Sequence, residues 1–234
     1  TGVQTCALPI FYASQANTAG SNNIAIGENA LYNNTASNNV AIGYAAGGSN
    51  TSGAVTSVGY QSSYNNTTGD ITAFGYQAGY SNTTGIYNTA LGGQSLRQNS
   101  TGQYNTAVGG DAMRFNTTGL YNTSVGAFAL NANTTTSANT ALGYDSLRNN
   151  IASNNTAVGF QAANANTSGS VTAVGYQAGY SNTSGASITA IGYQALLSNT
   201  TGGANTAIGL YSLYSNTAGN YNNAIGVSSL VSNS

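Results

Sequence analysis

Charged side chains are almost missing from this chain of 234 residues, of which they form 3%. An ordinary soluble domain carries roughly 25%. Three cations and four acids leave a formal net charge of −1. Such a chain cannot neutralise a run of nucleic-acid phosphates or dock on an anionic membrane through a basic patch. Since no apolar run approaches the roughly 20 residues of a membrane helix, we expect neither a nucleic-acid partner nor a membrane span.

The residues that most enzymes use for catalysis are equally scarce. The chain has no His, and its three cations are all arginines, so it lacks a histidine base and a lysine nucleophile. The acids lie far apart in sequence, at Glu28, Asp70, Asp111 and Asp145. The Gly-rich stretch 44–53 lacks the Gly-Lys-Ser/Thr ending of a phosphate-binding loop. We therefore expect no enzyme activity, no cofactor and no metal site.

A tripeptide of Ala or Ser, an aliphatic residue or Phe, and Gly recurs every 16 or 17 residues. Its glycine, which we call the glycine column, stands at Gly27, Gly43, Gly59, Gly75, Gly92, Gly109, Gly126, Gly143, Gly159, Gly175, Gly192, Gly209 and Gly226. Seven residues after each glycine stands an asparagine, without exception. This Asn column comprises Asn34, Asn50, Asn66, Asn82, Asn99, Asn116, Asn133, Asn150, Asn166, Asn182, Asn199, Asn216 and Asn233.

A repeat this short cannot hold a helix pair, and its Thr, Val, Ile and paired Gly disfavour helix. Each unit predicts a strand (consensus NTAIG), a second short strand (consensus YQALY, as in YQALL at 193–197) and turns rich in Asn, Thr and Gly. Stacked units form a parallel β-solenoid or β-roll. We predict an all-β fold of about 13 coils with 16–17 residues each, in one repeat domain over residues 11–234. Equivalent asparagines would then stack and bond amide to amide as a structural ladder.

The residue just before each glycine is always apolar, and we call this set the outer apolar column. Its members are Ile26, Ile42, Val58, Phe74, Leu91, Val108, Val125, Leu142, Val158, Val174, Ile191, Ile208 and Ile225. Neighbouring strand residues face opposite ways, and the Ala or Ser before each member takes the inner face. An unbroken apolar outer stripe favours an interface between identical chains around a common axis, preferably a homotrimer. The alternative is a monomeric solenoid that tolerates the stripe.

Units such as NNIAIGENAL (22–31), ITAFGYQAGY (71–80) and NTAIGLYSL (205–213) resemble the head repeats of trimeric autotransporter adhesins, the YadA-like head. They are also similar to repeats of phage tail fibres. The resemblance covers residues 11–234 and implies a left-handed trimeric β-roll outside the cell, on a cell surface or a virion. The family repeat is shorter, near fourteen residues, and the NTTG-type turn is an addition here.

These observations predict a structural or adhesive fibre segment, an adhesin head or a tail-fibre shaft, whose partner would be a host-surface glycan or protein receptor. The alternative is a monomeric ligand-, glycan- or ice-binding β-solenoid. It is motivated by a Thr column three residues before the glycine, as at Thr56, Thr72, Thr89 and Thr106. Ice binding favours paired outward threonines, whereas the strand partner of this Thr is aliphatic.

Residues 1–10, TGVQTCALPI, match no later unit and hold the only Cys and Pro. Counting back from Asn17 places the repeat strand at residues 6–10, where all five positions differ from it. The segment lacks the basic and apolar regions of a signal peptide. It resembles a translated sequencing adapter. We predict that residues 1–10 are non-native and that 11–234 is a stretch of a longer array, truncated at both ends and recovered from environmental DNA.

Three minor features have a structural and a functional interpretation, and we favour the structural one for each. A tyrosine follows the glycine at Tyr44, Tyr60, Tyr76, Tyr144, Tyr176 and Tyr193 and is expected to pack across coils rather than bind ligands. Asp111 with Arg114, and Asp145 with Arg148, are expected to form surface ion pairs rather than a sugar site. Nine Asn-column residues begin Asn-x-Ser/Thr sequons, and we expect them to lie inside and carry no glycan.

Overall fold

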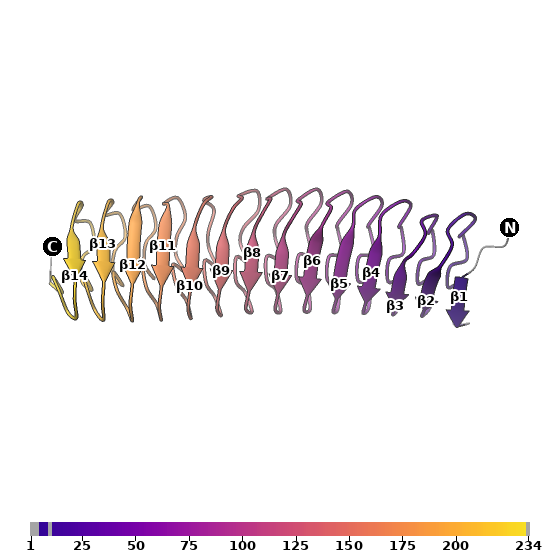
Figure 1. Ribbon diagram of the computed structural model, residues 1–234, viewed down its shortest axis with the longest axis horizontal. Coiled ribbons are helices and arrows are strands. Elements are labelled where there is room, and N and C mark those ends of the chain that lie inside the picture. Colours follow the sequence, from indigo (N-terminus) through magenta and orange to yellow (C-terminus); the bar gives the residue numbers. More distant parts are fainter. Residues whose placement is uncertain (1–4, 9–10, 233–234) are drawn as a thin grey trace. The chain divides into compact units, whose positions relative to one another are not determined.

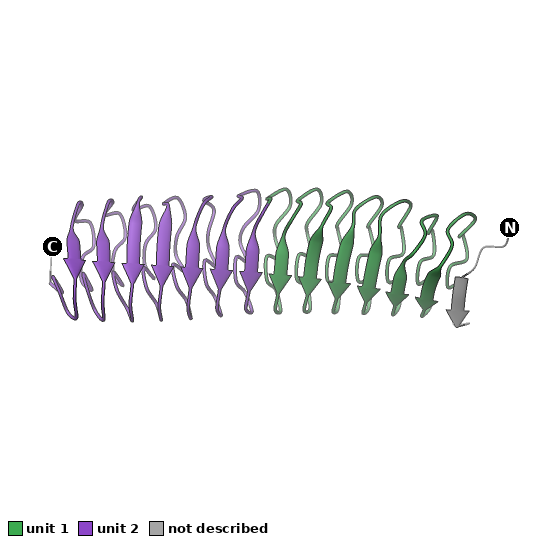
Figure 2. Ribbon diagram, viewed as in Figure 1, with its two compact units in different colours: residues 1–120 green, residues 121–234 purple. Residues whose placement is uncertain are grey.

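The computed structural model describes residues 11–232 and the backbone of residues 5–8. The described residues are all-β and contain no α-helix, as the sequence predicts. The chain divides into two compact units, residues 1–120 (unit 1) and 121–234 (unit 2) (Figure 2). In each unit every coil contributes one short strand, and neighbouring strands pair in parallel in chain order (Figure 1). Each unit is thus a parallel β-solenoid.

The strands differ in length by one residue. Unit 1 holds β1 (Thr5–Leu8), β2 (Asn23–Ile26), β3 (Val40–Ile42), β4 (Val55–Val58), β5 (Ile71–Phe74), β6 (Asn88–Leu91) and β7 (Thr106–Val108). Unit 2 holds β8 (Thr123–Val125), β9 (Thr140–Leu142), β10 (Thr156–Val158), β11 (Val171–Val174), β12 (Ile188–Ile191), β13 (Thr206–Ile208) and β14 (Asn223–Ile225). Members of one sequence column pair with each other, as Ala73 does with Ala90.

Side chains alternate between the inside and the outside of each strand, as a pleated backbone requires. The Ala or Ser two residues before the glycine is fully buried, for example Ala41, Ser57 and Ala73. The residue four before the glycine also points inward, and we call this set the inner column. The Thr column and the outer apolar column face outward.

The glycine column is fixed by two independent constraints. Its members have φ between 125° and 138°, a region that L side chains rarely adopt. A Cβ on Gly92 would also lie 2.6 Å from the carbonyl oxygen of Gly109 on the next coil. Both constraints follow from the turn that ends the strand, and they explain why no other residue occurs at this column.

The expectation of a second strand at YQALY is wrong. This arm consists of successive turns, in which the residues two and four after the glycine have positive φ although most are not glycine. Leu96 adopts φ 47°, and such a left-handed residue costs roughly 1–2 kcal/mol. Its side chain is fully buried, which contributes roughly 1.5–3 kcal/mol. Burial of the side chain therefore offsets the backbone cost, and positive φ cannot be recognised from a Leu.

Strand β1 lies within residues 1–10, the segment that matches no later repeat unit. Its backbone pairs with β2 and places Leu8 opposite Ile26. The sequence pattern places the repeat strand at residues 6–10, which would put residue 9 opposite Ile26. The predicted alignment of this segment with the repeat is therefore wrong by one residue. Residues 9 and 10 lie outside the described residues. The adapter origin of residues 1–10 stays a prediction.

The two units share a longer sequence period of seven coils. Asn34–Asn39 (NTASNN) corresponds to Asn150–Asn155 (NIASNN), 116 residues later, and both lack the turn glycine of other coils. The following coils correspond in the same way, since Val55 matches Val171 and Tyr64 matches Tyr180. Each unit therefore offers matched positions at which the effect of a local sequence difference can be judged.

Candidate functional site

The Asn column forms a ladder of buried amides within each unit. Each Nδ2 donates to the Oδ1 of the preceding Asn, at 2.7–3.1 Å from Asn34 to Asn116 and 2.8–3.0 Å from Asn150 to Asn216. In most coils the same Nδ2 also donates to the carbonyl of the turn glycine, as Asn99 does to Gly102 at 3.0 Å. Both amide hydrogens are thus satisfied without water, which a buried amide requires.

Coils without the turn glycine use other acceptors. Asn34 and Asn150 donate to the carbonyls of Ala36 and Ala152, and Asn133 donates to that of Thr136. The Thr136 hydroxyl also donates to Oδ1 of Asn133. Asn233 lies outside the described residues. The Asn-column residues at which sequons begin are buried in every described case, so they are not accessible for glycosylation in the folded chain. Asn33 and Asn154 also begin sequons, and both are exposed.

A second set of buried asparagines, which the sequence analysis missed, stands in the inner column. It comprises Asn23, Asn39, Asn88, Asn105, Asn122, Asn139, Asn155 and Asn205. The Oδ1 of such a residue accepts the backbone N–H that opens the next strand, as between Asn39 and Val55 or Asn155 and Val171, both at 2.7 Å. The signal was the Asn of NTAIG. Interruptions by Val and Ile disguised it as an ordinary strand residue.

Four coils carry an apolar residue in the inner column instead, at Val55, Ile71, Val171 and Ile188. We call these the apolar coils and the others the Asn coils. Where the inner-column residue of the preceding coil has no side-chain amide, the backbone N–H that opens the next strand donates to a backbone carbonyl instead. The N–H of Ile71 donates to the carbonyl of Ala54, and that of Ile188 to the carbonyl of Ser170, both at 3.0 Å. A backbone carbonyl thus replaces a side-chain amide, and the strands of the apolar coils begin one residue earlier than those of most Asn coils, β2 and β6 excepted.

The turn arm compensates for the volume of the inner column. Asn coils mostly carry Leu or Met four residues after the glycine, and these side chains are fully buried except that of Leu230 in the last coil. Three of the four apolar coils carry a small residue there, at Ser63, Gly79 and Gly179, whereas the coil of Ile188 carries the buried Leu196. A Cβ on Gly79 would lie 2.4 Å from Cδ1 of Ile71. With the exception of the coil of Ile188, the two kinds of coil therefore fill the same interior with different side chains, a volume-conserving exchange.

The outer apolar column lies on the outward face of the strands. Ile42, Phe74, Leu142, Val174, Ile191 and Ile225 are exposed, and the other members are half-buried. Phe74 is 41% and Leu142 46% exposed. The Thr column runs beside it in register, for example Thr72 opposite Thr89. Each unit therefore presents a stripe of apolar side chains bordered by threonine. Its role as an interface stays a prediction.

The tyrosines after the glycine column stack across coils, as expected. Tyr44, Tyr60 and Tyr76 stack in unit 1 with centroids 5.1 and 5.4 Å apart. Tyr144, Phe160, Tyr176 and Tyr193 do so in unit 2 at 4.9–5.4 Å. The pKa of Tyr193 is raised, first by desolvation and then by the neighbouring phenols. Ring faces at this spacing contribute favourable contacts beyond buried area.

The charged residues form local pairs. Arg114 and Asp111 are 3.1 Å apart, and Arg148 and Asp145 are 3.2 Å apart, which confirms the expected pairing. Asp145 is buried, however, so the second pair is not the surface pair that was expected. Arg148 also lies over the Phe128 ring, 5.0 Å from its centroid. Among the described residues no three His, Cys, Asp or Glu side chains gather as metal ligands. Nor does that part of the chain contain a helix long and apolar enough to cross a membrane.

Comparison with known proteins yields no relative: no family model matches the chain, and no curated protein or solved structure shows significant similarity to it. The β-solenoid repeat fold is therefore established by the structure, while the resemblance to adhesin heads and tail fibres rests on the repeat residues alone.

Proposed function

We propose that this chain is a non-catalytic structural and adhesive fibre segment that works as a homotrimer outside the cell, with its outer apolar columns packed around a common axis. The observation that carries the proposal is the exposed apolar stripe in each unit. Exposed, contiguous apolar surface on a soluble protein usually marks an interaction site. A stripe that repeats once per coil is matched best by an identical stripe, and cyclic symmetry closes such a contact.

The interior supports a fibre role. Two sets of buried, fully bonded asparagines tie each coil to its neighbours, and such a stack resists local opening because each rung satisfies the next. We propose that the load-resisting element of the fibre is this interior, and that a host-surface glycan or protein is contacted by the outward turns.

Cysteine cross-linking tests the interface. In a trimer with a common axis, equivalent residues of the stripe meet, so Phe74→Cys chains would form disulfides with one another. Chains carrying Ile191→Cys would do the same, but a mixture of the two variants would yield no Phe74–Ile191 product. Tyr76→Cys, outside the stripe, is the control, and the unaltered chain measures the background from Cys6. Mixed products, or no cross-link above background, would contradict the proposal.

A second candidate is a monomeric ice-binding solenoid. Its support is the outward Thr column, aligned in register along the strands of each unit beside the aliphatic residues. A thermal-hysteresis measurement on the unaltered chain decides this candidate. Hysteresis that disappears in Thr72→Tyr and Thr172→Tyr variants would establish it, and the absence of hysteresis would remove it.

A further inference from the structure

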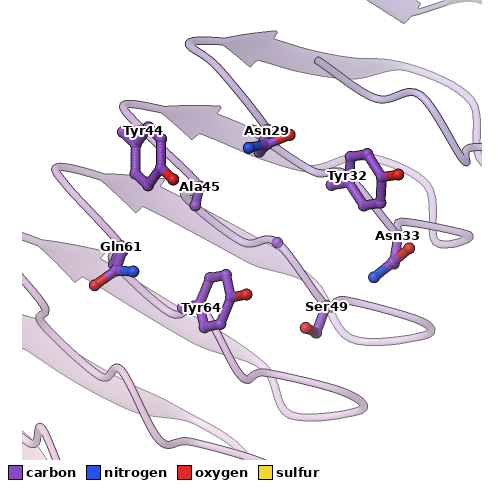
Figure 3. A pocket seen from close by; sticks show the side chains of 9 residues that line it. Asn29, Tyr32, Asn33, Tyr44, Ala45, Ser49, Gln61 and Tyr64 are labelled. Atoms are coloured by element: carbon purple, nitrogen blue, oxygen red, sulfur yellow. The ribbon is translucent and has the colours of Figure 1, made fainter. Parts of the chain in front are cut away.

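A pocket of about 340 Å³ opens on the turn arm of unit 1 (Figure 3). Its floor is Ala45 and Gly48, both buried. At the place of Gly48 the preceding coil carries Tyr32 and the following coil Tyr64. At the place of Ala45 the following coil carries Gln61. The pocket therefore arises where one coil lacks two side chains that its neighbours have.

The missing ring leaves a slot between two tyrosines. Coils are spaced by about 4.8 Å, so the side chains of Tyr32 and Tyr64 start two spacings, roughly 10 Å, apart. Tyr64 stacks on Tyr80 at 5.5 Å on its far side, which holds its ring in place. A Cβ on Gly48 would lie 3.1 Å from the Tyr64 ring, so Tyr64 closes one wall down to the floor. The volume of about 340 Å³ is enough for one six-membered ring beside Tyr64.

The rim of the slot offers an amide donor without its usual acceptor. Gln77 donates through Nε2 to Oε1 of Gln61 at 2.9 Å, one rung of a side-chain amide ladder. The next rung would run from Nε2 of Gln61 to the coil of Ala45, which has no acceptor there. Asn29, Asn33 and Ser49 also line the pocket, and none of its lining residues is charged. The site thus suits a neutral ligand with hydroxyl groups.

The matching coil of unit 2 carries larger side chains at both of these places. Gln161 stands where unit 1 has Ala45, and it accepts from Gln177 at 2.9 Å. Asn164 stands where unit 1 has Gly48, and it is buried and donates to the carbonyl of Asp145 at 3.0 Å. The fold accommodates larger side chains at both places. Ala45 and Gly48 are therefore not required by the solenoid.

We propose that this pocket binds one pyranose ring of a neutral saccharide, sandwiched between Tyr32 and Tyr64 and hydrogen-bonded by Gln61. Aromatic faces accept the C–H faces of a sugar, and side-chain amides pair with its equatorial hydroxyls. The inference deepens the adhesive part of the proposed function and rests on it, but it needs no trimer. It gives that adhesion a ligand class and a place in unit 1.

Saturation-transfer NMR on the full chain tests the proposal, with the methyl β-pyranosides of glucose, galactose, mannose and N-acetylglucosamine as probes. We expect transfer to at least one probe, and at least a tenfold weaker affinity in Ala45→Gln. This variant introduces the residue of the matching coil, where φ is 54° against 51° at Ala45, so it should fold. Tyr64→Ala should also lose binding, whereas Tyr180→Ala, the matched position in unit 2, should keep it.

The proposal is overturned if no glycoside binds, or if binding persists unchanged in Ala45→Gln. It is also overturned if p-cresol, a mimic of a protein side chain, competes for the slot while every glycoside fails. The mass of each sample, measured in parallel, separates the two proposals. A sugar-binding monomer would refute only the trimer, and a trimer that binds no sugar would refute only this site.

Discussion

The Asn coils and the apolar coils reach the same strand register by different chemistry. In an Asn coil such as that of Asn39, a side-chain amide accepts the N–H of the next strand. After an apolar coil such as that of Val55, a backbone carbonyl one residue earlier accepts it. The side chain is therefore replaceable wherever the backbone can supply the acceptor. The Asn column and the glycine column have no such substitute in any coil, which explains why they never vary.

Substitutions in the glycine column should lower the unfolding free energy most, and by the same amount in Asn coils and in apolar coils. Gly92→Ala combines an unfavourable φ with a Cβ 2.6 Å from a carbonyl oxygen, so we expect a loss of about 3 kcal/mol or more in unfolding free energy. Gly93→Ala is the matched control, since a Cβ there meets no atom within 4 Å. Urea unfolding followed by circular dichroism measures both, and equal stabilities would contradict the steric account.

The Asn column comes next. Asn99→Ala removes the acceptor of Asn116 and the donor to Asn82, so buried polar groups lose partners at a cost of about 3 kcal/mol. Thr101→Ala, on the exposed turn of the same coil, should change stability by less than about 0.5 kcal/mol. The same unfolding measurement applies. An Asn99→Ala protein as stable as the control would show that the ladder is dispensable.

The volume exchange between the inner column and the turn arm predicts coupled substitutions. Gly79→Ala should cost about 2 kcal/mol, because its Cβ meets Cδ1 of Ile71 and because φ is 59°. Ile71→Val removes that Cδ1. A double-mutant cycle should therefore show a favourable coupling of about 1 kcal/mol. Strict additivity of the two changes would argue against the exchange.

A substitution of an inner-column asparagine should lower the unfolding free energy least. Asn88 accepts the N–H of Asn105 at 3.0 Å, but Asn88→Val would let that N–H turn to the carbonyl of residue 87, as happens after the apolar coils. We expect a loss of about 1 kcal/mol, well below that of Asn99→Ala. A loss as large as that of Asn99→Ala would mean that the two kinds of coil are not interchangeable.

The sequence predicted much of the fold because each column repeats one constraint in every coil. The period and the strand position follow from the glycine and Asn columns, which never change, and the inward column follows from positions that carry only Ala or Ser. The turn arm could not be predicted, because Leu96 and its equivalents adopt positive φ only when burial compensates. The inner asparagines were missed because Val and Ile interrupt them. The pocket at Gly48 depends on two absent side chains, and a Gly-rich stretch alone does not show what surrounds it.

The most direct test of the central claim is the mass of the full chain by light scattering across a dilution series, with circular dichroism to confirm folding. The account predicts about 70 kDa, three times the 23.4 kDa of one chain, at every concentration at which the protein stays folded. A folded 23.4 kDa species would contradict it and leave the outer apolar stripe free for another partner.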